Sequence, residues 1–261
     1  MRISTFASGS SGNCALLSMD GVHILLDAGI SYRRIKENLA LSGLTPEALS
    51  AVLITHDHTD HIAGLATMVR HCGVPVCAPR TVANHLRYTI AGVNQCLQEI
   101  RAGEPFSVRS LILTAFHTPH DTDESVGWRI CGSTCFAFAT DMGYVTEEIR
   151  SGLAGADTVL IEANHDEEML RYGPYPAMLK RRILSDHGHL SNTCCGELAA
   201  YLADRGTKQI ILGHLSRENN TPAKAFQTVR HALGDRETAL FVAPAAERLT
   251  LELNEEKPCL A

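Results

Sequence analysis

The sequence predicts an α/β (α+β) protein in which two β-sheets pack together and carry helices on their outer faces. Apolar runs of strand length alternate with helical periodicity along the chain, and mixed strands with interspersed helices are typical of such layered architectures. Hydrophobic residues make up 45% of the sequence and charged residues 20%, as in ordinary globular proteins. Because no Pro/Gly/Ser-rich linker or repeat interrupts the pattern, we expect residues 1–261 to form one domain.

The opening segment predicts a β-meander. A first strand is followed by two apolar runs, residues 15–17 and 22–26, which are joined by Met19-Asp20-Gly21. An Asp-Gly pair suits the positive φ of a tight turn. The two runs are therefore expected to pair as a hairpin.

Capping signals define the helices that follow. Ser31 and Thr45 have the side chains of N-caps, Pro46 suits a first helical position, and Gly43 is a stop. Helices are predicted over residues 31–42, from Thr45 onward, over 62–72 and 81–90, after Ser191 and after Thr221. Strands are predicted over residues 51–55, 74–78, 111–116, 126–130, 135–139, 158–163 and 209–212, with two closing strands. Residues 254–261 are expected to be a frayed tail.

Composition excludes several classes of protein. Residues 1–18 lack the apolar core and cleavage site of a signal peptide, and no segment approaches the roughly 20 apolar residues that span a bilayer. We therefore expect a cytoplasmic protein that does not bind membranes. The formal net charge of −6 argues against non-specific coating of nucleic acid, which needs many Lys and Arg contacts. The nine cysteines show no C-x-x-C spacing and are expected to be mostly reduced and buried.

The segment after the predicted strand 51–55 carries the strongest functional signal. It reads His56-Asp57-His58-Thr59-Asp60-His61, with three histidines and two aspartates in six positions. Imidazole nitrogens and carboxylate oxygens bind divalent first-row metals, and a tight loop after a strand can hold several of them around one or two ions. The spacing H-x-H-x-D-H is far more specific than a lone H-x-H. A solvated polar turn is the weaker interpretation.

One loop cannot fill two coordination spheres, so further ligands are needed at the ends of later strands. Asp141 and His214 each follow an apolar run. A third such segment, His117-Thr118-Pro119-His120-Asp121, leaves His117 and His120 as competing candidates. Ligation by nitrogen and oxygen alone suits Zn²⁺, Mn²⁺ and Fe alike, so the sequence does not choose the metal.

Together with Asp27 in Leu25-Leu26-Asp27-Ala28-Gly29, these motifs resemble those of the metallo-β-lactamase superfamily. The resemblance covers the whole chain and implies a four-layer αββα sandwich with two divalent metal ions at one edge. It favours His120 over His117, because a His-Asp pair followed by Ser125-Val126-Gly127 resembles the nuclease-like branches. Asp27 would fix the loop of histidines by hydrogen bonds. The implied ligands are His56, His58 and His120 for one ion, Asp60, His61 and His214 for the other, and Asp141 as the bridge.

Two further motifs resemble the branch of this superfamily that processes RNA and DNA. Glu162 lies in the predicted strand 158–163, and His189 lies just before a predicted helix. In that branch a histidine oriented by a glutamate protonates the leaving oxygen. A phosphodiester needs this proton because its alkoxide leaving group is a strong base. The alternatives are a purely structural hydrogen bond for Glu162 and a helix-capping position for His189.

Taken together, the motifs resemble the YycJ/WalJ-type family, which is associated with 5′-to-3′ exonuclease action on DNA. The resemblance implies a hydrolase in which a metal-bound hydroxide attacks a phosphodiester, with Asp60, Glu162 and His189 as the catalytic side chains. Its partner would be a nucleic acid, DNA before RNA, and no obligatory protein partner is implied. The segments that carry the resemblance are Gly9-Ser10-Ser11-Gly12-Asn13, Glu162-Ala163-Asn164-His165-Asp166, Gly188-His189-Leu190-Ser191-Asn192 and His214-Leu215-Ser216-Arg217-Glu218-Asn219-Asn220.

The loop Gly9-Ser10-Ser11-Gly12-Asn13 is a candidate site for a 5′-terminal phosphate. Its glycines permit unusual backbone angles, so its N–H groups and the side chains of Ser10, Ser11 and Asn13 could turn toward one anion. A tight connection between two strands explains the same residues equally well.

Two other features keep open interpretations. His165 could contact substrate, cap the next helix or lie near a metal, and Lys180-Arg181-Arg182 could meet a nucleic-acid backbone or be a solvated helix surface.

Three rival functions remain at this point. An RNA endonuclease would use the same residues. A small-molecule hydrolase, acting on a cyclic phosphodiester, thioester or lactone, would keep the metal ligands without needing Glu162 and His189. A DNA-binding module without activity is disfavoured because no proposed ligand position is missing.

Overall fold

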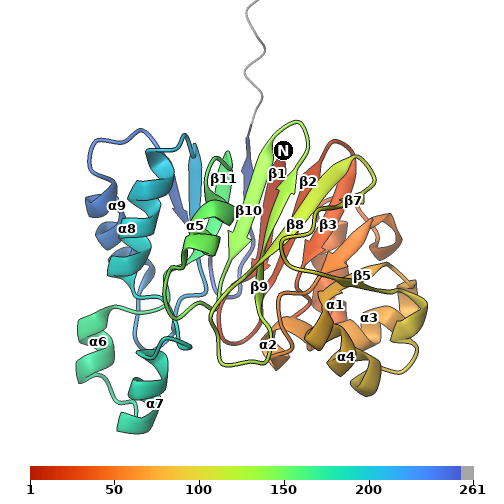
Figure 1. Cartoon of the computed structure of the whole chain (residues 1–261), viewed down its shortest axis with the longest axis horizontal. Coiled ribbons are helices and arrows are strands. Elements are labelled where there is room, and N and C mark those ends of the chain that lie inside the picture. The colour runs from red at the N-terminus through yellow and green to blue at the C-terminus, as the bar shows by residue number, and fades with distance from the viewer. Residues whose placement is uncertain (254–261) are drawn as a thin grey trace, which may run out of the picture.

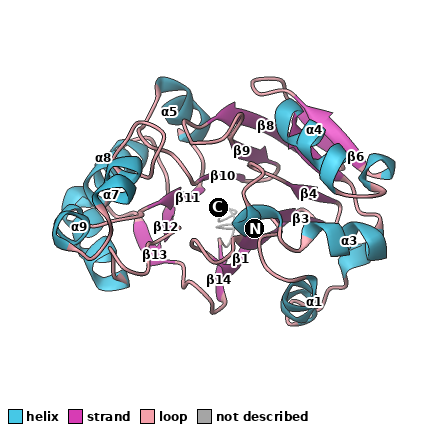
Figure 2. Cartoon of the chain, turned by 90° about the horizontal axis from the view of Figure 1, so that it is seen from below, coloured by secondary structure: helices cyan, strands magenta, loops and turns pink. Residues whose placement is uncertain are grey.

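Two seven-stranded sheets lie face to face at the centre of the molecule, and helices cover the outer face of each (Figures 1 and 2). The computed structural model describes residues 1–253, so the predicted tail lies outside the described residues. The layers confirm the predicted αββα sandwich.

The first sheet combines an antiparallel meander with a parallel half. From β14 to β3 its neighbours are antiparallel, and from β3 to β6 they are parallel. Asp20 and Gly21 have φ of 53° and 75°, which confirms the predicted tight hairpin. In sheet order the strands are β14 (Leu249–Glu252), β1 (Arg2–Ala7), β2 (Cys14–Met19), β3 (Val22–Leu26), β4 (Ala51–Leu53), β5 (Val76–Pro79) and β6 (Leu97–Ile100).

The second sheet repeats this arrangement. Strands β10 to β13 are parallel, and β7 to β10 are antiparallel. In sheet order the strands are β13 (Ala239–Val242), β12 (Gln209–Gly213), β11 (Thr158–Glu162), β10 (Cys135–Ala139), β9 (Val126–Cys131), β8 (Leu111–His117) and β7 (Phe106–Val108). The sequence did not predict β6 and β7, which are short and half-exposed and therefore carry little hydrophobic signal.

Helices cover the two outer faces and one edge. The helical segments are α1 (Tyr32–Ala40), η1 (Pro46–Ala48), α2 (Thr59–Ile62), α3 (Leu65–Cys72), α4 (Arg80–Thr89), η2 (Val93–Gln95), α5 (Glu147–Leu153), α6 (Glu167–Tyr172), α7 (Ala177–Ile183), α8 (Asn192–Ala203) and α9 (Pro222–Leu233). Ser31 and Thr221 cap α1 and α9 by accepting main-chain N–H bonds, as predicted. Helices α5, α6 and α7 were not predicted.

Two predicted helices differ in the structure. The one expected from Thr45 is a single 3₁₀ turn, and Thr45 makes no side-chain cap bond. The one expected over residues 62–72 begins at Leu65 as α3, because Gly64 N donates to Ala28 O at 2.8 Å and not to the preceding turn. The short helix α2 precedes it and begins inside the H-x-H-x-D-H motif.

Three apolar clusters hold the layers together. One lies between the sheets around the fully buried Trp128, and the other two lie between each sheet and its helices. Six cysteines of residues 1–253 are free, as predicted, although only Cys14, Cys77 and Cys195 are fully buried. Cys131 and Cys135 are the exceptions, because they face each other across β9 and β10 and form a disulfide. Among the described residues, no helix has the length and apolarity that crossing a membrane requires.

Candidate metal centre and catalytic site

The segments that carry the predicted ligands leave the strands at one edge of the sandwich, where α2 lies at the bottom of Figure 1. Asp27, Asp141 and His214 follow β3, β10 and β12, and their φ angles are 54°, 58° and 56°. A left-handed backbone is uncommon for residues other than glycine and is tolerated best by Asp, Asn and His. Three site residues thus share a strained conformation, which is typical of functional positions.

His56, His58 and His120 form one ligand set, with one ring nitrogen from each lying within 4.8 Å of the others. Hydrogen bonds select the nitrogen that faces the centre. His56 Nδ1 donates to Thr55 Oγ1 at 2.9 Å and His120 Nδ1 donates to the carbonyl oxygen of Gly188 at 3.3 Å. The Nε2 atoms of these two rings are left to bind a metal.

Asp60, His61 and His214 form a second set within the same limit of 4.8 Å. His61 Nδ1 donates to Asp27 Oδ2 at 2.8 Å, and His214 Nδ1 donates to Glu162 Oε1 at 2.9 Å. Both Nε2 atoms therefore point toward Asp60 Oδ2, at 3.6 and 3.7 Å.

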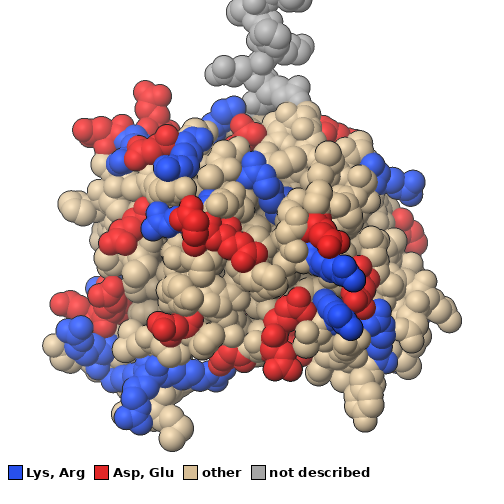
Figure 3. Space-filling model, in the orientation of Figure 1, with Lys and Arg blue, Asp and Glu red and all other residues tan. Residues whose placement is uncertain are grey.

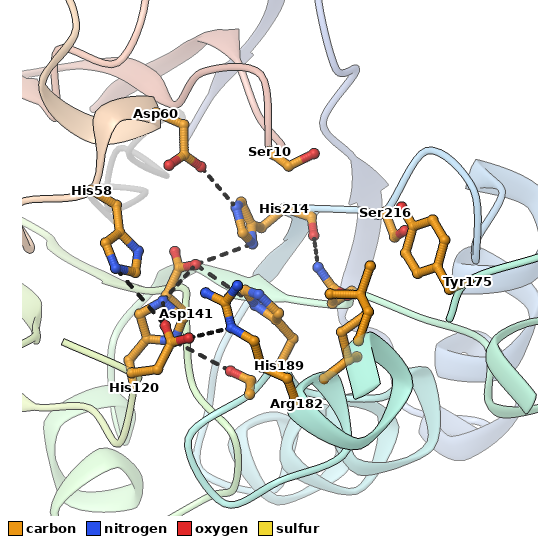
Figure 4. A pocket seen from close by; sticks show the side chains of 15 residues that line it. Ser10, His58, Asp60, His120, Asp141, Tyr175, Arg182, His189, His214 and Ser216 are labelled. Carbon is orange, nitrogen blue, oxygen red and sulfur yellow. Dashed lines mark hydrogen bonds and ion pairs between the residues drawn. The ribbon is translucent and has the colours of Figure 1, made fainter. Parts of the chain in front are cut away.

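Asp141 lies between the two sets (Figure 4). Its Oδ1 atom is 3.6 Å from His120 Nε2, and its Oδ2 atom is 3.3 Å from His61 Nε2. Oδ1 is also 3.5 Å from His214 Nδ1, so the carboxylate lies within reach of both sets.

Unpaired buried atoms show that these residues fit metal ions. Within residues 1–253, His56 Nε2, His214 Nε2 and Asp141 Oδ2 are buried without a hydrogen-bond partner. An unsatisfied buried polar group destabilises a protein by about 1–3 kcal/mol. Nitrogen and carboxylate donors pointing at a common centre are what divalent first-row metals bind, and a metal would satisfy all three atoms.

The charges of the site are balanced around Asp141. Burial raises the pKa of Asp141, but His214 and His61 lower it well below its ordinary value. Burial lowers the pKa of His61, whereas Asp27 and Asp141 raise it to about 10. Burial also lowers the pKa of His214, but chiefly Asp141 raises it above its ordinary value, so protons on His61 and His214 offset the carboxylate charge when no metal is bound. Metal ions would replace those protons, because ligating histidine is neutral.

Asp27 supports the histidine loop from below. Its side chain is fully buried and accepts bonds from Thr55 N at 2.9 Å, Thr55 Oγ1 at 3.1 Å and His61 Nδ1. These bonds fix the ring orientation and the tautomer of His61. Thr55 links the same carboxylate to His56, a role that sequence reasoning did not find.

Glu162 positions two histidines from beneath the site. Its Oε1 atom accepts from His189 Nδ1 at 2.8 Å and from His214 Nδ1, while its Oε2 atom accepts from Met142 N at 2.9 Å and Leu190 N at 3.3 Å. Burial raises its pKa, but His189 and His214 lower it to about 2, so it is an anion. Protein donors contact both oxygens, so Glu162 orients His189 and His214; it also lies with Asp141, His189 and His214 in a further group whose atoms could hold a metal ion.

His189 occupies the remaining side of the centre. Its Nδ1 atom is held by Glu162, which leaves Nε2 free beside the cavity. Burial lowers the pKa of His189, but the Glu162 carboxylate raises it above its ordinary value. A histidine whose Nδ1 is held by a carboxylate can donate a proton from Nε2 when the ring is protonated.

A cavity of about 250 Å³ opens onto these groups. Figure 4 shows His58 and His120 on one side of it and Tyr175 and Ser216 on the other. Tyr175, Ser216 and Arg182 also line it and were not assigned to the site from sequence. No motif surrounds Tyr175, and Arg182 belongs to a basic run that could equally be solvated.

His117 and His120 were alternative candidates for the same ligand position, and their side chains lie in different places. His117 is the last residue of β8, is exposed, and bonds to Glu148 Oε1 at 3.1 Å. His120 is buried and lies with His56 and His58. The structure therefore brings only His120 to the centre.

In the loop of residues 9–13, main-chain N–H groups that were expected to face an anion are bonded within the protein. Gly9 N donates to Asn13 Oδ1 at 2.8 Å, Gly12 N donates to Gly9 O at 2.9 Å, and Asn13 N donates to Asp60 O at 2.7 Å. The buried Asn13 thus fastens the loop to the metal centre and offers little to a substrate. Ser10 lines the cavity, and Ser11 Oγ accepts from Arg217 at 2.6 Å on the rim.

His165 lies in the wall of a second cavity, of about 350 Å³, which also reaches His189. It is 2% exposed, and both ring nitrogens lack a partner within residues 1–253. Asp166 and not His165 caps α6, and His165 belongs to none of the metal-ligand groups found in the described part of the chain.

Comparison with known proteins places this site in a family. Residues 23–215 match the model of the beta-lactamase superfamily domain, so the chain belongs to that superfamily. It is 36% identical over 245 residues to "Exodeoxyribonuclease WalJ" of Streptococcus pneumoniae, which covers 92% of this chain and 91% of that protein. It is 33% identical to "Exodeoxyribonuclease YycJ" of Bacillus anthracis, over 90% of both chains. These identities make it a homologue of both.

The fold is shared more widely. The metallo-beta-lactamase fold protein YhfI from Bacillus subtilis superposes with a TM-score of 0.73 at 15% identity, covering 97% of this chain and 100% of YhfI. This likeness shows the fold alone.

Proposed function

We propose that this protein is an exodeoxyribonuclease that depends on two divalent metal ions and degrades DNA from the 5′ end. Hydrolysis is supported by the geometry of the site. Two candidate ligand sets of three residues lie on either side of Asp141, and Glu162 holds His189 at the cavity. DNA as the substrate is supported by the two exodeoxyribonuclease homologues, which align over nine-tenths of the chain.

The ligands proposed for one metal are His56, His58 and His120, and those for the other are Asp60, His61 and His214, with Asp141 shared. Such a pair of ions activates water and stabilises the charge on the attacking and leaving oxygens of a phosphodiester. Zn²⁺, Mn²⁺ and Fe all suit these ligands.

His189 is the proposed proton donor to the leaving oxygen. Glu162 keeps its Nδ1 protonated and aims Nε2 at the cavity, and the raised pKa of His189 favours the protonated ring that donates the proton. Asp60, at the edge of the second ligand set, is partly exposed to the cavity and can also orient the attacking water.

Ser10 and Ser11 are the proposed contacts for the 5′-terminal phosphate. Ser10 lines the cavity, and the guanidinium of Arg217 donates to Ser11 Oγ, so a cation stands beside the loop. Asn13 holds the loop in place. His165, with both ring nitrogens unpaired in the second cavity, is the proposed contact for another part of the strand.

Metal-loaded protein incubated with DNA labelled at either the 5′ or the 3′ end tests the proposal. We expect the 5′ label to be released first, as a mononucleotide. The strand that carries the 3′ label should shorten by one nucleotide at a time. Substrates with a 5′-hydroxyl in place of the 5′-phosphate should be cut more slowly, and Ser10→Ala with Ser11→Ala should reduce that preference. Internal cuts in matched RNA, with DNA left intact, would instead identify an RNA endonuclease, and turnover of small esters alone would identify a small-molecule hydrolase.

A further inference from the structure

Arg182 lies in the last turn of α7 and lines the cavity of the metal centre, which no other arginine of residues 1–253 does. Figure 3 shows Lys and Arg side chains at the lower left, where Figure 1 places α6 and α7, with Asp and Glu side chains close to them. Because the charge of this region is mixed, the contacts of each cation decide what it can do.

The two basic neighbours of Arg182 on α7 have other surroundings. Lys180 lines the second cavity, and its Nζ atom donates to Arg171 O at 2.8 Å. Arg181 is exposed and lines neither cavity. The run Lys180-Arg181-Arg182 thus brings a single guanidinium to the metal centre.

A carboxylate holds Arg182 at the cavity. Arg182 Nε donates to Asp121 Oδ2, and Asp121 Oδ1 lies 3.2 Å from His120 Nε2, which belongs to the first ligand set. The loop around Asp121 is itself fixed, because His120 is buried and Thr122 Oγ1 donates to Asp57 Oδ1 at 2.8 Å. The ion pair therefore ties the guanidinium to the edge of the metal centre.

Most of the guanidinium remains free to bind a ligand. The bond to Asp121 uses Nε, and neither terminal nitrogen of Arg182 has a hydrogen-bond partner in the part of the chain that the structure describes. A guanidinium presents its N–H donors as a rigid fork that matches two oxygens of one phosphate. Figure 4 shows Arg182 at the same cavity as Asp141 and His189.

We propose that Arg182 contacts the non-bridging oxygens of the phosphodiester that is cut and stabilises the charge they gain during hydrolysis, and that Asp121 positions it. In this reaction the water oxygen bonds to phosphorus while the bond from phosphorus to the leaving oxygen breaks. A fixed cation at the non-bridging oxygens lowers the barrier because their charge grows on the way to the transition state. The inference rests on the proposed function, because it takes phosphodiester hydrolysis as the reaction of this cavity.

Hydrolysis of bis(p-nitrophenyl) phosphate by the metal-loaded protein tests Arg182, because this small diester can occupy the cavity without reaching the outer surface. Arg182→Ala should lower kcat by about 10²-fold, the cost of removing one group that stabilises charge in the transition state, while KM changes less. Arg181→Ala is the matched control. It makes the same change at the neighbouring residue and should leave kcat unchanged, so equal kcat values for the two variants would overturn the proposal.

Chemical rescue separates a contact with the substrate from an ion pair that only supports the fold. Arg182→Ala should bind both metal ions, and guanidinium chloride well below denaturing concentrations should raise its kcat, whereas NaCl at the same ionic strength should not. Guanidinium should not raise the kcat of His189→Ala, which lacks a different group. If Arg182→Ala loses metal, or if guanidinium leaves its kcat at the NaCl value, the role in catalysis is overturned.

A double-mutant cycle tests Asp121. Asp121→Asn should lower kcat by about fivefold, because an exposed ion pair holds its partner weakly. It should keep both ions, since Asp121 belongs to none of the ligand groups found in residues 1–253. In the Arg182→Ala background the same change should cost nothing further, because no guanidinium is left to position. Losses that multiply, or a loss of metal, would overturn the positioning role.

The proposed function and this inference can fail separately when the same variants are compared on DNA. If the wild type hydrolyses the small diester but releases no nucleotides from DNA, the proposed substrate is wrong, and the effect of Arg182 is still measured on the small diester. If DNA is degraded and Arg182→Ala matches Arg181→Ala on both substrates, the proposed function stands and Arg182 has no part in it.

Discussion

Replacing Asp27 by Asn changes one acceptor beneath the histidine loop and little else. Asn keeps the shape of the side chain and tolerates the left-handed backbone of this position, φ 54°. The carboxylate of the wild type accepts from Thr55 with one oxygen and from His61 Nδ1 with the other. In the Asp27→Asn variant one of these atoms is an NH₂ group, which cannot accept. The bond to His61 therefore breaks, or the ring adopts the other tautomer and turns a proton toward the metal.

The size of the effect follows from the bond that is lost. A hydrogen bond to a charged group contributes about 1.5–3 kcal/mol, and 1.4 kcal/mol is a factor of ten in affinity. We therefore expect the second metal to bind about 10- to 100-fold more weakly, the range seen when such orienting partners are removed. The metal-free protein should also lose about 1.5–3 kcal/mol of unfolding free energy.

Asp57→Asn is the matched control, because it makes the same chemical change in the same loop. Asp57 accepts from Thr122 Oγ1 at 2.8 Å and faces His85, away from both ligand sets. Titration with Zn²⁺ against a chromophoric chelator gives the affinities, and urea unfolding of the metal-free variants gives the stabilities. If Asp27→Asn binds both ions as tightly as Asp57→Asn does, the hydrogen bond to His61 does not orient a ligand, and the reasoning is refuted.

Three further predictions test the other groups of the site. Asp141→Asn, which also tolerates the left-handed backbone, and the harsher Asp141→Ala should abolish activity and release at least one ion; metal analysis that still finds two ions would remove Asp141 as the bridge. His120→Ala should lose more metal than His117→Ala, since only His120 lies among the ligands, and equal losses would contradict that difference. His189→Ala should keep both ions and slow DNA hydrolysis by about 10²–10⁴-fold. The loss should shrink on an activated aryl phosphodiester, and an equal loss on both substrates would exclude His189 as the proton donor.

The residues that lie together at the candidate metal centre could be predicted from the sequence because they follow apolar strands. The H-x-H-x-D-H segment is contiguous, and Asp141 and His214 come after runs that became β10 and β12. Parallel strands bring such positions to one edge, so spacing alone gathers them. The hairpin at Asp20-Gly21 and the cap at Ser31 were predictable for a similar reason, since both depend on neighbouring residues only.

Features that depend on distant residues were not predictable in this way. His117 and His120 are three positions apart, and only the pairing of His117 with Glu148 on α5 shows that it faces away. The predicted helix over residues 62–72 is interrupted at Gly64 because its N–H group bonds to Ala28 O, which is far away in the sequence. Tyr175 belongs to no motif, and it lines the cavity because the segment between α6 and α7 lies beside the site.

The central claim is that two metal ions, held on either side of Asp141, cleave DNA. The most direct measurement is the rate of nucleotide release from 5′-phosphorylated single-stranded DNA as metal-free protein is titrated with one metal, with the bound ions per chain determined at each point. We predict no release without metal and a rate that rises as the second ion binds to each chain. Release that persists in the metal-free protein, or that never appears with two ions bound to the wild type, would contradict the account.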